Sequence, residues 1–125
     1  MKYYLSLGSN IDPANHLDLA IFELSNIFEN TLSSSIHKTP AEGFDGEDFL
    51  NLVFCGSCSL SFDELNKKLK DIEDKAGRDR SAPKFSSRTL DIDIVLQLSE
   101  DDEILFESDE IAKYSFVSEP LSELL

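Results

Sequence analysis

Two segments with a helical repeat of apolar residues are each bracketed by segments rich in strand-forming residues, and this order constrains the fold more than any other feature. Apolar side chains recur at intervals of three and four in residues 13–28 and again in 62–76. The segments typical of strands are 2–7, 31–38, 49–59 and 89–98. The order strand, helix, strand, strand, helix, strand predicts an α+β fold, a split βαβ sandwich with a mainly antiparallel sheet and helices on one face.

Residues at the ends of both helical segments favour these boundaries. Asp12 can cap the first helix, with Pro13 at its first position. Ser61 and Glu64 have the spacing of a capping box, in which the Ser hydroxyl accepts from the backbone N–H three residues on and the Glu reaches back. Gly77 stands where a helix is expected to end.

The other segments are expected to be loops or short elements. Residues 39–48 and 78–87 are long enough to be binding loops or lids. Residues 104–106 predict a short strand, and 115–125 a strand or a short helical turn. The turn Gly8-Ser9-Asn10 lacks the lysine and spacing of a P-loop, so we expect its Ser and Asn side chains to fix nearby backbone groups.

The chain of 125 residues is expected to form one domain over 1–125. No run approaches the roughly 20 apolar residues of a membrane helix, and the start lacks the pattern of a secretory signal, so we expect a cytoplasmic protein without a membrane partner. Cys55 and Cys58 have CxxC spacing, but no second cysteine pair completes a zinc site. We interpret them as reduced, partly buried thiols, with redox or metal use as the alternative.

The charge distribution argues against nucleic acid and for one anionic ligand. The formal charge of −14 disfavours phosphate-backbone binding, which is driven by basic side chains. Eight of the eleven basic residues nevertheless lie in 67–88, where only four acidic residues oppose them. Such a basic segment in an acidic chain is typical of a bound anion, although for Lys67 to Lys70 a solvated helix face is the alternative.

Two aspartates in the last predicted strand are the candidate metal ligands. The period of two sends Asp91 and Asp93 to the same face, about 7 Å apart at Cα, because each strand residue rises ~3.3 Å. Paired carboxylates repel unless a cation compensates them, and their hard oxygens suit Mg²⁺. An ordinary solvated strand face is the alternative. Arg88, three residues upstream of Asp91, favours a phosphoryl-transfer site, which needs carboxylates for metal and guanidinium groups for phosphate.

Three segments carry a resemblance to a known family. They are Tyr4-Leu5-Ser6-Leu7-Gly8-Ser9-Asn10, Asp48-Phe49-Leu50-Asn51 and Arg88-Thr89-Leu90-Asp91-Ile92-Asp93-Ile94. In this order they resemble the successive motifs of 6-hydroxymethyl-7,8-dihydropterin pyrophosphokinases, over residues 1 to about 98. The resemblance implies a ferredoxin-like fold and transfer of pyrophosphate from ATP to the pterin hydroxymethyl group, with release of AMP, in folate biosynthesis.

The resemblance also implies roles for single residues. Asp91 and Asp93 would bind two Mg²⁺ ions and, with Arg78 and Arg88, would form the catalytic group. The residues implied for ATP are Glu73, Arg78, Arg80, Lys84 and Arg88. The residues implied for the pterin are Thr39, Gly43, Phe49, Asn51 and Phe116, with the two aromatic rings on either side of the ligand. For each aromatic residue a core position is the alternative, and for Glu73 a solvated helix position.

The last quarter of the chain departs from the family pattern. Tyr114 stands where the family has an arginine, and the acidic segment 107–110 lies in the region of a histidine. Replacing cation-capable groups with carboxylates weakens nucleotide binding. The alternatives are therefore a diverged, non-catalytic pterin-binding or interaction protein and a phosphotransferase with another acceptor alcohol. The expected partners are a pterin and ATP, with the protein as a monomer.

Overall fold

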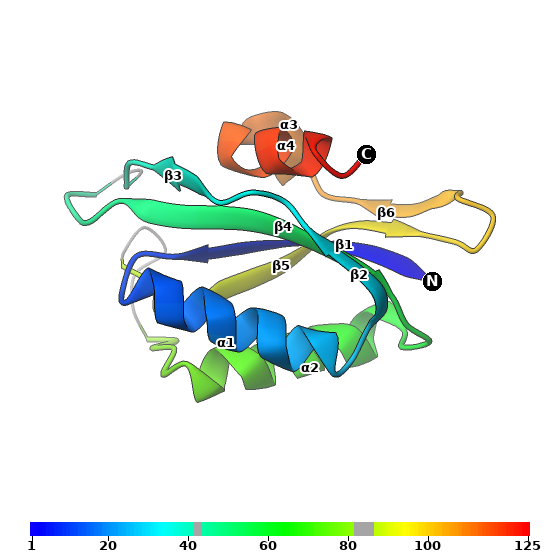
Figure 1. Ribbon diagram of the computed structural model, residues 1–125, viewed down its shortest axis with the longest axis horizontal. Coiled ribbons are helices and arrows are strands. Elements are labelled where there is room, and N and C mark those ends of the chain that lie inside the picture. The colour runs from blue at the N-terminus through cyan, green and yellow to red at the C-terminus, as the bar shows by residue number, and fades with distance from the viewer. Residues whose placement is uncertain (42–43, 82–86) are drawn as a thin grey trace.

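A single twisted sheet runs through the molecule and carries helices on both faces (Figure 1). The computed structural model describes residues 1–41, 44–81 and 87–125. The strands are β1 (Lys2–Ser9), β2 (Glu29–Ser33), β3 (His37–Thr39), β4 (Phe49–Ser57), β5 (Asp91–Leu98) and β6 (Ile104–Glu107). The helices are α1 (Pro13–Ser25), α2 (Phe62–Lys75), α3 (Glu110–Lys113) and α4 (Ser115–Ser122). None of the helices in these described ranges is long and apolar enough to cross a membrane.

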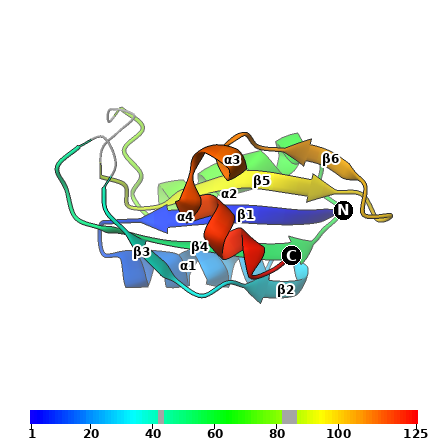
Figure 2. The same ribbon diagram turned by 90° about the horizontal axis from the view of Figure 1, so that it is seen from above.

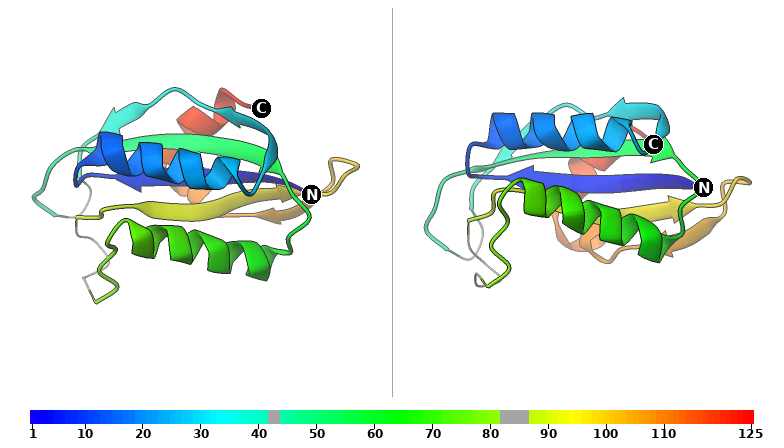
Figure 3. Two further views of the ribbon diagram at one scale, coloured as in Figure 1. Left: turned by 60° about the horizontal axis from the view of Figure 1, so that its bottom comes forward. Right: turned by 90° about the horizontal axis from the view of Figure 1, so that it is seen from below.

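The strand order confirms the predicted split βαβ sandwich. It runs β2-β4-β1-β5-β6, with β3 also pairing with β4, and β1 is antiparallel to both of its neighbours. Helix α1 connects β1 to β2, and α2 connects β4 to β5, so each helix crosses over one intervening strand. Both lie side by side on the same face of the sheet, which gives the ferredoxin-like arrangement (Figure 3).

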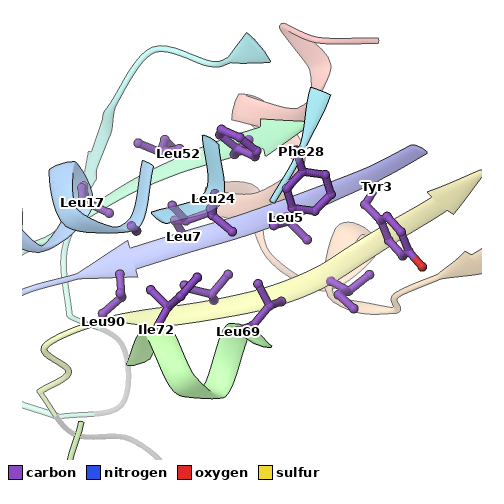
Figure 4. Packing of buried hydrophobic residues seen from close by; sticks show 14 of the residues in the cluster. Tyr3, Leu5, Leu7, Leu17, Leu24, Phe28, Leu52, Leu69, Ile72 and Leu90 are labelled. Carbon is purple, nitrogen blue, oxygen red and sulfur yellow. The ribbon is translucent and has the colours of Figure 1, made fainter. Parts of the chain in front are cut away.

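The core between this face and the two helices explains why the helices form there. Alternate residues of β1 (Tyr3, Leu5 and Leu7) are fully buried and meet Leu17 and Leu24 of α1 (Figure 4). Leu69 and Ile72 of α2 close the same cluster. Each fully buried leucine contributes roughly 1.5–3 kcal/mol relative to an exposed one, so the amphipathic pattern determines the helix faces.

The second face of the sheet is apolar as well, and the expectation that helices cover one face only is wrong. Tyr4, Val53 and Val95 are buried in a second cluster, which α4 completes with Val117 and Leu121. Figure 2 shows α3 and α4 lying over this face. The segment expected as a strand or a short helical turn is therefore largely a helix, because exposed apolar strand residues gain free energy when an apolar helix face covers them.

The sheet corrects one predicted strand and shows a bulge in another. Residues 31–38 form two strands, because the chain between β2 and β3 leaves the ladder and the Ser34 hydroxyl accepts from the Val53 N–H at 2.9 Å. In β5 the register with β1 shifts between Tyr4 and Leu5, which leaves Val95 as the extra residue of a bulge. Leu96 consequently joins the Tyr4 cluster instead of following Ile94, whereas Asp91 and Asp93 lie before the bulge.

The helix boundaries are mostly those predicted. The capping box of Ser61 and Glu64 is present, and Gly77 follows α2 with a φ of 81°. Asp12 occupies the cap position of α1 but makes no side-chain bond to the helix backbone, and its carboxylate accepts from the Asn15 side chain instead. Helix α1 ends at Ser25, and Phe28 leaves it to pack edge-on against Phe54.

Candidate active site

A pocket of about 230 Å³ lies on the face of the sheet that carries α3 and α4, and residues of both helices line it. It combines residues from the central strands with residues from the β3–β4 connection and the C-terminal helices. Its lining is Ser6, Gly8, Thr39, Pro40, Phe44, Phe49, Asn51, Arg88, Asp91, Asp93, Glu110, Tyr114 and Phe116. Segments that are far apart in sequence thus meet at one place.

One part of the pocket is aromatic with a polar edge. Phe49 meets Phe44 edge-on at a centroid distance of 6.3 Å, and the Phe116 ring is stacked on Tyr114 at 4.8 Å. Asn51, only 4% exposed, donates from Nδ2 to the Thr39 hydroxyl at 2.8 Å. Flat rings and an oriented carboxamide suit a planar heterocycle with hydrogen-bonding groups along its rim.

Another part of the pocket is lined by carboxylates. Asp91 and Asp93 of β5 lie beside Gly8 and Ser6 of β1, and these small partners leave space above the strand. Burial, followed by the negative charges of Asp91, Glu110 and Glu73, raises the pKa of Asp93 to about 8. A group of carboxylates under this mutual repulsion fits a divalent cation, because hard oxygen ligands suit Mg²⁺ and its charge relieves the repulsion.

Arg88 is held at the pocket by the turn that follows β1. The Arg88 backbone N–H donates to Asn10 Oδ1 at 2.8 Å, and the Asn10 N–H donates to the Arg88 carbonyl at 3.1 Å. The Ser9 hydroxyl donates to the Thr89 carbonyl at 2.6 Å. The prediction that Ser9 and Asn10 fix nearby backbone groups is confirmed, and the groups they fix are those that place Arg88.

A cluster of ionic residues lies behind Asp91, at the end of α2. Arg78 donates to Asp91 Oδ1 at 3.0 Å and lies 3.4 Å from a Glu73 oxygen. Arg80 contacts the other Glu73 oxygen at 3.1 Å and Asp74 at 2.9 Å. Burial raises the pKa of Glu73 above its ordinary value, against the opposing effect of the Ile92 N–H and the two arginines. The end of α2, the start of α1 and the start of β5 lie at the same end of the sheet (Figure 3).

The residues expected to form the site fall into three groups. Those that line the pocket are Thr39, Phe49, Asn51, Arg88, Asp91, Asp93 and Phe116. Those that lie in the ionic cluster behind Asp91 are Glu73, Arg78 and Arg80. Gly43 and Lys84 lie outside the described residues.

Sequence reasoning missed six of the lining residues. Ser6 and Gly8 face the aspartates through the β1–β5 register, which no local pattern reveals. Pro40 and Phe44 belong to the β3–β4 connection, whose length alone had marked it as a binding loop. Glu110 and Tyr114 lie in the segment that departs from the family pattern, and this departure is the sequence signal that points to them.

The two cysteines are free and point to opposite sides of the sheet. Cys55 is buried in the cluster beneath α4, and Cys58 packs against the cluster beneath α1 and α2. Burial raises the pKa of both thiols, which disfavours the reactive thiolate. The expectation that both thiols are at least partly buried is confirmed, and their reduced state stays a prediction.

Comparison with known proteins agrees with the earlier resemblance and extends it to the end of the chain. A family model described as 7,8-dihydro-6-hydroxymethylpterin-pyrophosphokinase matches residues 4–125. A 2-amino-4-hydroxy-6-hydroxymethyldihydropteridine pyrophosphokinase of Aquifex aeolicus is 36% identical over 78% of this chain and 61% of its own length.

Two further relatives are similar to this chain over most of its length. A protein of the same name from Haemophilus influenzae is 32% identical over 97% of this chain and 79% of its own length. A folate synthesis bifunctional protein of Chlamydia caviae is 37% identical over 74% of this chain and 22% of its own length. The chain thus spans about three-fifths of the Aquifex relative and about four-fifths of the Haemophilus relative. The chain belongs to the 7,8-dihydro-6-hydroxymethylpterin-pyrophosphokinase family.

Proposed function

We propose that this protein transfers a pyrophosphoryl group from ATP to 6-hydroxymethyl-7,8-dihydropterin in folate biosynthesis. In this reaction the hydroxymethyl oxygen forms a bond to the β-phosphorus of ATP. The bond from that phosphorus to the oxygen retained by AMP breaks, and the hydroxyl proton is released. The observation that carries the proposal is one pocket in which Phe49, Phe116 and Asn51 adjoin Asp91 and Asp93.

The aromatic part of the pocket is the proposed pterin site. Phe49 and Phe116 stack on the two faces of the ring, and Asn51 bonds its amide edge. Thr39 holds the Asn51 carboxamide in one orientation through the 2.8 Å bond, so the rim donors and acceptors of the pterin meet a fixed partner. Gly43 is proposed as part of the same loop.

The nucleotide site is proposed at the carboxylate part and the adjoining arginines. Arg88 and Arg78 bind phosphate oxygens, because a guanidinium offers paired donors that match them. Arg80 and Lys84 are proposed to add positive charge from the segment after α2. Glu73 contributes to the nucleotide site by pairing with Arg78 and Arg80. The acidic chain otherwise repels ATP, so these cations carry the attraction.

Asp91 and Asp93 fit Mg²⁺ and are proposed to hold two ions with the ATP phosphates. When bound, the metal neutralises phosphate charge and orients the β-phosphorus toward the hydroxyl. The chain itself contributes two carboxylates from alternate residues of β5, and Arg78 pairs with Asp91 at 3.0 Å. Gly8 and Ser6 keep the space above these carboxylates open.

The deciding test is formation of AMP from ATP with 6-hydroxymethyl-7,8-dihydropterin. We expect AMP only when ATP, the pterin and Mg²⁺ are all present. Asp91→Ala and Asp93→Ala are each expected to lower turnover by about 10²-fold or more, since the charge of the transferring group is then uncompensated. Normal turnover in either variant would contradict the proposal that Asp91 and Asp93 bind the metal.

A non-catalytic pterin-binding protein is the second candidate, and Glu110 and Tyr114 favour it. Both line the pocket, whereas the family pattern has cation-capable groups in this segment. Calorimetry separates the candidates, because binding of the pterin without binding of Mg-ATP supports the second one. A cytoplasmic location and a monomeric state stay part of the proposal. The absence of nucleic-acid binding is also proposed, and it rests on the acidic composition.

A further inference from the structure

The outer edge of β5 lacks a neighbouring strand along the stretch that carries the two aspartates. β6 pairs only with Leu96, Gln97 and Leu98, beyond the bulge, and β1 lies on the other side. Within the described part of the chain, the outer edge of the Asp91–Asp93 stretch therefore has no strand to bond. Backbone groups that are buried without a partner are costly, so something else must satisfy them.

Two side chains take the place of the missing strand: Glu73 in the last turn of α2 and Arg78, which follows this helix. The Ile92 N–H donates to Glu73 Oε2 at 2.8 Å in a buried hydrogen bond. The Leu90 carbonyl accepts from Arg78 at 3.2 Å. Ile92 is the residue between the two aspartates, so the Glu73 bond acts on the backbone that determines their spacing.

The Glu73 carboxylate is itself fixed from several sides. Its side chain is 6% exposed, against 41% for Asp91. Arg80 contacts Oε1 at 3.1 Å, and Arg78 lies 3.4 Å from Oε2. Arg78 then reaches Asp91 Oδ1 at 3.0 Å, which makes a continuous path from Glu73 to the pocket carboxylate.

We infer that Glu73 is a positioning residue for the metal-binding aspartates and acts through the Ile92 backbone and Arg78 without touching ATP. This inference rests on the proposed function and sharpens it. Glu73 does not line the pocket, and both of its oxygens are already engaged in the ionic cluster. Its carboxylate keeps β5 straight at Asp91 and Asp93 and keeps the Arg78 guanidinium against Asp91, so that the pair meets a divalent ion in one geometry.

Glu73→Gln, with Asp74→Asn as its matched control, tests this role. The glutamine keeps the shape and an acceptor for Ile92 but loses the charge that holds Arg78 and Arg80. Asp74 also pairs with Arg80 yet makes no bond to β5, so its variant removes a charge from the same cluster without disturbing the strand. Two quantities are measured. Calorimetry gives the affinity for Mn²⁺ in the presence of a non-hydrolysable ATP analogue, and AMP assays give the Mg²⁺ dependence of turnover.

We expect Glu73→Gln to weaken Mn²⁺ binding and raise the half-saturating Mg²⁺ concentration by about tenfold, the effect typical of partners that orient metal ligands. Its pterin affinity should stay within about twofold of wild type, and Asp74→Asn should change neither quantity by more than about twofold. Unchanged metal binding in Glu73→Gln, or an equal loss of pterin and metal affinity, would overturn the inference.

Two further results keep the test decisive. If Glu73→Gln does not fold, Glu73→Asp replaces it, because a carboxylate shorter by one methylene cannot reach Ile92 and Arg80 together, and the same selective loss of metal affinity is expected. If wild type forms no AMP but binds Mn²⁺ with the analogue, the proposed function fails while the inference is still judged on metal affinity. Absence of Mn²⁺ binding in wild type overturns it.

Discussion

The backbone of Gly8 and the carboxamide of Asn51 are in close contact, since a Cβ atom added at Gly8 would lie 2.9 Å from Asn51 Oδ1. The two residues are direct partners in the β1–β4 ladder. Asn51 is 4% exposed and bonded to Thr39, so its side chain has little freedom to withdraw. Gly8 therefore makes room for the group proposed to read the pterin edge.

Gly8→Ala is expected to lower pterin affinity by about tenfold, which corresponds to about 1.4 kcal/mol, because the added methyl displaces the Asn51 carboxamide. Fluorescence titration with the pterin measures it. Gly77→Ala is the control, because the φ of 81° at this position is strained for alanine. We expect this variant to lower the free energy of unfolding by ~1 kcal/mol and to retain pterin affinity. Equal pterin affinity in Gly8→Ala and wild type would contradict the role of this contact.

Asp93 is expected to make the metal-free protein less stable as pH rises. Its folded-state pKa of about 8 lies above the ordinary value of 3.8, so its contribution is complete below the ordinary pKa and is lost as pH rises to about 8. Asp93→Asn removes this dependence. In EDTA, the melting temperature of Asp93→Asn should exceed that of wild type by a margin that grows up to pH 8 and then levels off. Addition of Mg-ATP should reduce this difference in melting temperature. A constant margin across this range would refute the raised pKa of Asp93.

Tyr114→Arg is expected to lower the KM for ATP by about fivefold, or about 1 kcal/mol, because it adds a cation to a pocket that contains Glu110 and the two aspartates. Tyr114→Phe is the matched control, since it keeps the ring stacked on Phe116 at 4.8 Å and should leave this KM unchanged. Steady-state AMP assays give both values. A KM that rises in Tyr114→Arg would show that the tyrosine itself serves the nucleotide.

Glu123 is expected to hold the end of α4 against the chain between β2 and β3 in an acid-sensitive manner. Its carboxylate accepts from the Ser35 N–H at 2.8 Å and contacts His37, and these bonds lower its pKa to about 2. Because the folded pKa is below the ordinary 4.5, this contribution is present above pH 4.5 and is lost as pH falls toward 2. The melting temperature of Glu123→Gln should therefore be lower than that of wild type at pH 6. The difference between the two melting temperatures should shrink as the pH falls toward 2. A gap that persists at pH 2 would exclude this mechanism.

Local patterns determined much of this protein. The order of strands and helices follows from the two repeats of apolar spacing, and the helix ends follow from Ser61, Glu64 and Gly77, because capping bonds form between near neighbours. The common face of Asp91 and Asp93 follows from the period of two in a strand. These features depend on residues only a few positions apart, which is the range that a sequence pattern describes.

Only the tertiary structure decided the rest. The bulge at Val95 turns Leu96 to the other face, and the apolar surface around Tyr4 requires α4 as a cover. Glu73 is a buried partner of Ile92, 19 residues away, although its helix position alone is equally compatible with exposure to solvent. Such contacts depend on how β1 aligns its two neighbours and on which buried backbone groups find no strand, and both are properties of the whole sheet.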